Sequence, residues 1–147
     1  MAVLLGGPAA GQDFGTAMAN VFAGPLVDTS VTPGLPAWIG AVLFPLVNPI
    51  VEEMHYRGHV QPRLEPLSGT GALAISVMAV GFALQHVTYA LSIPGIGVYV
   101  AAYLVWGIGA GIVYTRMRRL TALIAAHFVT NASTAAVPLV LLLAGGG

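Results

Sequence analysis

The sequence predicts an all-α protein, a polytopic membrane helix bundle with four main transmembrane helices and a possible short N-terminal helix. Two observations predict this class. The 147 residues are 57% hydrophobic and only 7% charged, with a mean hydropathy of +0.88. Soluble domains carry about 25% charged residues, so this chain has too few to cover a water-facing surface. In addition, several apolar stretches approach the roughly 20 residues that a membrane-spanning helix needs.

The composition also excludes several classes of function. Five arginines balance five acidic residues, and without a basic stripe the chain is not expected to bind nucleic acid. Cysteine is absent, which excludes disulfides and thiolate metal sites. The length suits one domain. We expect residues 1–34 to form an N-terminal segment with a possible short or re-entrant helix, and residues 35–147 to form the functional core.

The first main helix is predicted to run from about residue 35 to about residue 64, with probable kinks at Pro45 and Pro49. The length of this helix is predicted from the depth at which Glu52 must lie in the membrane. At 1.5 Å per residue, Glu52 would lie about 18 Å from the end of such a helix, level with polar residues of later helices. If the helix stopped at Arg57, Glu52 would be only about 7 Å deep. We therefore expect the helix to continue past Arg57.

Three further apolar stretches are expected to form the other main helices. They cover Ala72–Leu91, Ile96–Thr115 and Leu120–Ala144. Turn or interface signals separate them at Ser68–Gly71, Pro94–Gly95 and Arg116–Arg119. Because positive charge favours the cytoplasmic side, we expect the Arg116–Arg119 turn to be cytoplasmic. The lipid bilayer is then the main partner of the chain, and we expect an integral protein of a prokaryotic cell membrane.

Adjacent carboxylates at Glu52 and Glu53 are the most unusual feature of this apolar chain. Ionisable groups at membrane depth are costly and usually serve a function. Glu53 precedes Arg57 by four residues, a spacing that predicts an ion pair within the helix. This leaves Glu52 as the carboxylate without an obvious local partner.

Polar residues at similar depth on three helices predict a site. One face of the first helix should carry Glu52, His55, Tyr56 and His59. The second helix contributes His86, and the last contributes His127 and Asn131, which are four residues apart. A carboxylate with imidazoles can act as a general base on water, and a second imidazole with a carboxamide can bind an oxyanion. The simpler alternative is helix–helix hydrogen bonding, worth only about 1 kcal/mol in bilayers.

Three motifs, in order, resemble those of the CPBP family of intramembrane proteases, also called the type II CAAX prenyl endopeptidase or ABI family. Residues Glu52–Gly58 (EEMHYRG) are similar to its EExxxR motif, in the EExxFRG form with Tyr56 at the aromatic position. Phe82–His86 (FALQH) resembles its FxxxH motif, and His127–Asn131 (HFVTN) its HxxxN motif. The resemblance extends over roughly Trp38–Thr134 and includes the glycine-rich stretch before the last motif.

The resemblance implies an intramembrane endopeptidase that cleaves a peptide or protein near the cytoplasmic leaflet, with prenylated substrates among the candidates. By the family's pattern, Glu52 and His86 would activate water. His127 and Asn131 would stabilise the oxyanion. Glu53 and Arg57 would support the site.

Zinc is a possible cofactor, because Glu52, His86 and His127 are ligand types that zinc accepts. His55 and His59 form a further pair four residues apart, a spacing that can hold metal. For these two we favour a simpler interpretation, polar residues near the cytoplasmic end of the helix. No acidic partner for the other histidines is apparent, so we favour a glutamate-dependent mechanism that requires no cofactor.

Two other functions fit parts of the pattern. The protein could be a non-catalytic membrane protein that binds haem or metal through His86 and His127, but Glu52 would then have no evident role. It could also be an immunity-type protein that binds peptides without cutting them. The intact motifs argue against that second alternative.

Overall fold

The computed structural model describes residues 35–90 and 93–145, and all regular structure in these two ranges is helical. The expected all-α class is therefore confirmed for the described residues. The elements, in order, are α2 (Leu35–Glu53), the π-helix η2 (Met54–Val60), α3 (Gln61–Ser68), α4 (Gly71–His86), the 3-10 helix η3 (Val87–Tyr89), α5 (Ile93–Met117) and α6 (Thr121–Gly145). The N-terminal helix that we considered within residues 1–34 lies outside the described residues.

Helices α2, η2 and α3 follow one another without a break, so the predicted continuation past Arg57 is confirmed. The helical stretch extends to Ser68, and Pro45 and Pro49 lie inside α2 without ending it. Gly69 then adopts a left-handed conformation with φ of 66°, which glycine accepts at little cost, and this ends α3.

The later helices lie close to their predicted bounds, with one correction. Thr70 caps α4 by accepting a hydrogen bond from the backbone N–H of Leu73 at 3.3 Å, which confirms the turn predicted before this helix. Pro94–Gly95 does not separate two helices, because both residues lie in the first turn of α5. Proline is tolerated there, since the N–H that it lacks has no partner in the first turn of a helix.

The π-helical turn η2 was not predicted. Its wider hydrogen-bonding pattern ends where the backbone N–H of Gln61 donates to the carbonyl of Tyr56, five residues earlier. Pro62 follows directly, and in an α-helix its ring would clash with the carbonyl of Gly58. We attribute the wider turn to the space that this proline requires.

The π turn changes which residues share a face. One α-helical turn holds about 3.6 residues. Side chains four residues apart are therefore not fully in line, and over several turns they move gradually around the helix. A π turn holds more residues and offsets this drift. As a result Glu53, Arg57 and Gln61 are all fully buried.

The face predicted for Glu52, His55, Tyr56 and His59 is therefore wrong in part. Glu52 and Tyr56 are half-buried, whereas His55 and His59 are exposed. His59 lies 2.7 Å from a guanidinium nitrogen of Arg63, outside the protein core. The π turn is the physical reason, because it rotates the residues of η2 relative to an α-helix.

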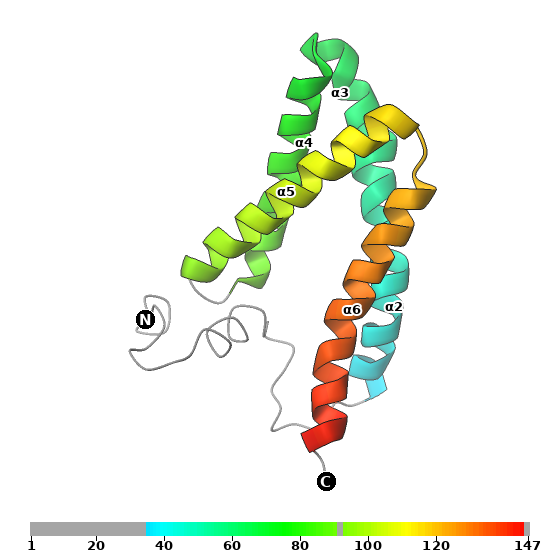
Figure 1. The fold of residues 1–147 in the computed structure, drawn as a ribbon, viewed down its shortest axis with the longest axis vertical. Coiled ribbons are helices and arrows are strands. Elements are labelled where there is room, and N and C mark those ends of the chain that lie inside the picture. Colours follow the sequence, from blue (N-terminus) through cyan, green and yellow to red (C-terminus); the bar gives the residue numbers. More distant parts are fainter. Residues whose placement is uncertain (1–34, 91–92, 146–147) are drawn as a thin grey trace.

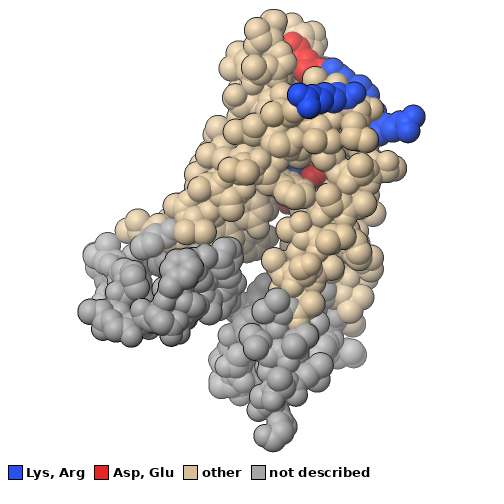
Figure 2. Space-filling view, viewed as in Figure 1, with Lys and Arg blue, Asp and Glu red and all other residues tan. Residues whose placement is uncertain are grey.

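The helices form two pairs that converge near α3 and diverge at the other end (Figure 1). One pair is α4 with α5, and the other is α2 with α6. Helix α3 packs against α4 at the convergent end. Charged side chains gather at this end (Figure 2), where Arg118 forms an ion pair with Glu65 at 2.8 Å.

Two of the described helical segments are long and apolar enough to cross a membrane, Gly71–Tyr89 and Gly95–Met117. Large apolar side chains are also exposed along α2 and α6, for example Val42, Val51 and Val129. These features agree with a bundle in lipid. By this criterion of length and hydropathy, two of the four expected spans are identified among the described residues.

Glycines on α5 allow close contact with α4. A Cβ atom at Gly107 would lie 2.8 Å from the Cα atom of Ala79, and one at Gly111 would lie 3.0 Å from a methyl carbon of Ile75. Small residues four apart on a helix let two backbones approach closely, as is common in membrane bundles. Gly109 lies between them in sequence, but a Cβ there would meet nothing within 4 Å.

We predict that Gly107→Ala destabilises the bundle, because the added methyl group meets the backbone of Ala79. The expected loss in the free energy of unfolding is about 1–3 kcal/mol, measured by denaturant titration in detergent micelles. The matched control is Gly109→Ala, which should be neutral or slightly stabilising. Equal effects of the two variants would contradict the close contact between α4 and α5.

Candidate active site

A buried ion pair lies at the centre of the site. Arg57 Nη1 is 3.0 Å from Glu53 Oε1, and both side chains are fully buried. The second terminal nitrogen of Arg57 donates to the carbonyl of Gly107 on α5 at 3.5 Å. The guanidinium also lies over the ring of Phe82 on α4, 4.7 Å from its centroid. The ion pair predicted within the first helix is confirmed, and it also connects this helix with α4 and α5.

His127 on α6 lies between the two glutamates. Its Nδ1 atom is 3.0 Å from Glu53 Oε1, and its Nε2 atom is 3.6 Å from Glu52 Oε2. An ionised carboxylate only accepts hydrogen bonds, so Nδ1 of His127 is the donor to Glu53. The prediction paired Glu53 with Arg57 alone. The structure adds His127 on the last helix, so the expectation that this histidine has no acidic partner is wrong.

Glu52 is the glutamate with exposed surface. Its side chain is 16% exposed, whereas that of Glu53 is fully buried. Figure 2 shows acidic surface in the hollow between the two helix pairs. Oε1 of Glu52 accepts a hydrogen bond from Gln85 Nε2 at 2.8 Å. Oε2 of each glutamate is a buried atom and has no hydrogen-bond partner among the described residues.

Gln85 is a site residue to which the sequence analysis assigned no role. It donates to Glu52, and its Oε1 atom accepts a hydrogen bond from the hydroxyl of Tyr56 at 2.7 Å. One signal could have identified it. A carboxamide beside His86, on an otherwise apolar helix, is a polar group that needs a partner at membrane depth.

His86 is buried close to this network but does not contact Glu52 directly. Its Nδ1 atom lies 2.7 Å from the carbonyl of Phe82, and its ring stacks on Tyr103 with centroids 3.6 Å apart. Because a carbonyl only accepts, Nδ1 carries the proton, and Nε2 of the neutral ring is an acceptor. In the described part of the chain no hydrogen bond joins His86 to Glu52. The ring of Phe82 lies against the rings of both His86 and His127, with centroid distances of 4.7 and 6.1 Å.

Asn131 follows His127 by four residues on α6. Its Nδ2 atom is buried and has no hydrogen-bond partner among the described residues. A buried donor without a partner is costly, so such a group in a native protein calls for an explanation. An amide N–H in apolar surroundings is suited to bind a developing oxyanion.

The possible zinc ligands do not form a metal-binding group. Within residues 35–90 and 93–145, no three His, Cys, Asp or Glu side chains are arranged so that they could hold a metal ion. Glu52 and His127 are neighbours, but His86 instead bonds to the Phe82 carbonyl. We therefore derive no step through zinc, and zinc dependence stays a prediction.

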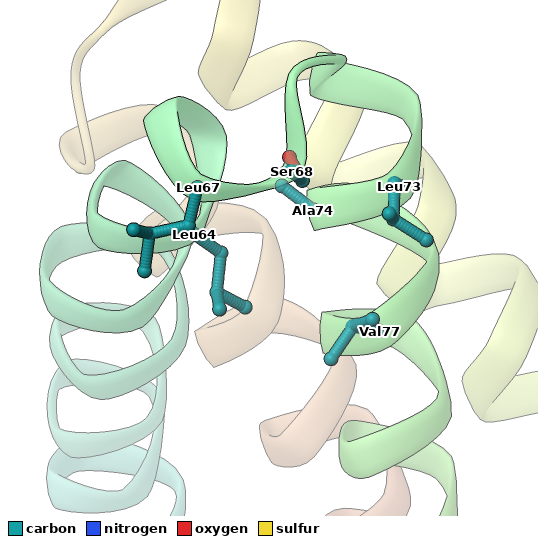
Figure 3. Close-up of a pocket in the computed structure, with 6 residues that line it drawn as sticks. All are labelled: Leu64, Leu67, Ser68, Leu73, Ala74 and Val77. Atoms are coloured by element: carbon teal, nitrogen blue, oxygen red, sulfur yellow. The ribbon is translucent and has the colours of Figure 1, made fainter.

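An apolar pocket elsewhere on the molecule is separate from this cluster. It has a volume of about 170 Å³ and lies between α3 and the start of α4 (Figure 3). Its lining consists of Leu64, Leu67, Ser68, Leu73, Ala74 and Val77. Because none of the candidate catalytic residues lines it, the chemistry is assigned to the polar cluster between the helix pairs.

We predict that Arg57→Met strongly destabilises the protein, because Glu53 would remain as a buried charge with His127 as its only donor among the described residues. The expected loss in the free energy of unfolding is about 3–5 kcal/mol. The matched control is Arg118→Met, which removes an exposed ion pair and should cost at most about 1 kcal/mol. Denaturant titration in micelles measures both variants.

A second substitution tests the cause of that loss. Adding Glu53→Gln to Arg57→Met removes the unpaired charge, so the double variant should be more stable than Arg57→Met alone. If the second substitution lowers stability further, the buried charge is not the cause.

Comparison with known proteins gives one family match. A family model described as type II CAAX prenyl endopeptidase, Rce1-like, matches residues 34–133. The match covers all three motifs, from Glu52 to Asn131. No curated protein and no solved structure matches the chain. The matched region is more than half of the chain, and the protein therefore belongs to the Rce1-like family of membrane-embedded type II CAAX prenyl endopeptidases.

Proposed function

We propose that this protein is an intramembrane endopeptidase in which Glu52 is the general base. One observation carries the proposal. Glu52 is the partly exposed carboxylate of a buried polar cluster, and it lies beside Gln85 of α4 and His127 of α6. Family membership supports a protease, and the arrangement of the cluster supports Glu52 as the residue that acts on water.

In the proposed reaction, a water molecule enters the hollow between the helix pairs and donates its proton to Glu52. Oε2 is the proposed acceptor, because Oε1 already accepts a hydrogen bond from Gln85. His86 helps to hold the water through Nε2, since Nδ1 is engaged by the Phe82 carbonyl. The oxygen of the water then attacks the carbonyl carbon of the scissile peptide bond. When the tetrahedral intermediate collapses, the C–N bond breaks and the proton held by Glu52 passes to the leaving amine nitrogen, which regenerates the carboxylate.

His127 and Asn131 stabilise the negative oxygen that forms. The unpartnered Nδ2 of Asn131 supplies an N–H donor. His127 is oriented by its bond from Nδ1 to Glu53. Nε2, which faces Glu52 and the reacting groups, donates to the oxyanion in the protonated ring, where both nitrogens carry hydrogen. Glu53 and Arg57 have a supporting role, because their ion pair holds His127 and limits the cost of a buried carboxylate. Preorganised donors of this kind are usually the largest contribution to such catalysis.

The setting of the reaction follows from the charges at one end of the molecule. We propose four spanning helices, with the turn at Arg116–Arg119 on the cytoplasmic side of a prokaryotic cell membrane. The substrate is then a peptide or protein cleaved near the cytoplasmic leaflet. Prenylated substrates are included, because the family description names prenyl endopeptidases. No cofactor is required in this mechanism.

We predict that Glu52→Gln lowers kcat by about 10²–10⁴-fold, because the amide cannot accept the proton from water. The assay is hydrolysis of a fluorogenic peptide by protein in liposomes, with farnesylated and unmodified forms of the same peptide. Glu65→Gln is the matched control, since Glu65 lies in the exposed pair with Arg118. This control should retain activity.

Unchanged activity of Glu52→Gln would overturn the proposed mechanism. Activity that a chelator removes and zinc restores would instead favour the metal-dependent alternative. Stoichiometric haem or metal on wild-type protein without hydrolysis would favour a carrier, and peptide binding without cleavage would favour an immunity-type binder.

We predict that Asn131→Ala lowers kcat by about 10²–10³-fold with little change in KM, because a transition-state donor is lost. Thr130→Ala is a matched control on the neighbouring exposed position, where the hydroxyl bonds only to the carbonyl of Ala126. A proportional rise in KM at unchanged kcat would contradict the role of Asn131 in binding the oxyanion.

A further inference from the structure

We infer that Gln85 and Tyr56 are positioning residues that orient the Glu52 carboxylate for proton transfer. The inference rests on the proposed role of Glu52 as general base. Two hydrogen bonds connect the three side chains in the order Tyr56, Gln85, Glu52. The Tyr56 hydroxyl donates to Gln85 Oε1 at 2.7 Å, and Gln85 Nε2 donates to Glu52 Oε1 at 2.8 Å.

The chemistry of these groups fixes the orientation of the amide. An ionised carboxylate only accepts hydrogen bonds, so the NH₂ group of Gln85 must face Glu52. A rotated amide would place two acceptor oxygens against each other. With NH₂ towards Glu52, the oxygen of Gln85 faces Tyr56, and the phenol hydroxyl supplies the donor that this oxygen needs.

Packing holds the hydroxyl of Tyr56 in place. Its ring lies edge-to-face against Phe82, with centroids 5.2 Å apart. The neighbouring position on α4 is Gly81, where a Cβ atom would lie 3.9 Å from Tyr56 Cε1. Tyr56 belongs to the π turn η2. The unpredicted turn therefore places a donor four residues after Glu52 on the side that faces α4.

The consequence is a difference between the two oxygens of Glu52. Oε1 is occupied by the Gln85 N–H, whereas Oε2 has no hydrogen-bond partner among the described residues and lies 3.6 Å from His127 Nε2. The Tyr56–Gln85 pair thus favours the orientation of the carboxylate in which Oε2 faces the histidine of α6. Small misplacements of a reacting group can cost about 10²-fold in rate.

The experiment compares Gln85→Leu, Tyr56→Phe and the double variant in the liposome assay. We expect Gln85→Leu to lower kcat by about 10–100-fold, with KM within about twofold of the wild type. Tyr56→Phe removes one hydroxyl and should lower kcat by about 3–10-fold. Because Tyr56 acts through Gln85, the double variant should be no slower than Gln85→Leu alone.

Gln61→Leu is the matched control for loss of a helix–helix hydrogen bond. Gln61 is a buried glutamine at the start of α3, and its amide donates to the Gly111 carbonyl, Thr115 and Glu65. Among the described residues no hydrogen bond joins it to Glu52. It should lower the unfolding midpoint but leave kcat of the folded protein within about twofold. A purely structural role for Gln85 predicts the same behaviour for Gln85→Leu.

The outcomes separate the two proposals. If Glu52→Gln is inactive while Gln85→Leu keeps its kcat, the positioning inference is wrong and the general base stands. If Gln85→Leu does not fold, Tyr56→Phe decides, and an unchanged kcat in that variant overturns the inference. Losses that multiply in the double variant also overturn it, because Tyr56 would then act independently of Gln85. If Glu52→Gln keeps its activity, the proposed function itself fails.

Discussion

The buried ion pair between Arg57 and Glu53 is the interaction on which the rest of the structure depends. Arg57 reaches the Gly107 carbonyl of α5 and the Phe82 ring of α4, and Glu53 accepts from His127 of α6. One pair of opposite charges therefore connects α2, α4, α5 and α6. In an apolar interior neither charge can be left alone without a large cost, so this contact favours the arrangement in which the helices meet at the ion pair.

Two backbone features make that contact possible. Gly107 and Gly111 bring α5 close to α4, and their carbonyls accept hydrogen bonds from Arg57 and Gln61. The π turn keeps these two polar side chains on the same buried side as Glu53. The two glycine carbonyls on α5 are four residues apart, and so are the two polar side chains that donate to them. The glycine spacing on one helix and the wider turn on the other thus match donors to acceptors.

The adjacent glutamates have different roles because their surroundings differ. Glu53 is buried and accepts hydrogen bonds from Arg57 and His127, so it holds the helices and His127 in place. Glu52 keeps exposed surface, a single oxygen bound by Gln85, and a second oxygen towards His127. In the proposed mechanism the two carboxylates divide the tasks, because Glu53 is compensated for stability and Glu52 accepts the proton from water.

Much of this protein could be predicted from local sequence. Composition determined the helical class, a spacing of four residues determined the Glu53–Arg57 pair, and turn residues determined the helix ends except at Pro94–Gly95. Only the tertiary structure decided the partners of Glu52. Its bond to Gln85 spans 33 residues, and the contact between His127 and Glu53 spans 74. Such contacts depend on how helices pack and on the register of the π turn, and neither follows from the periodicity of a single helix.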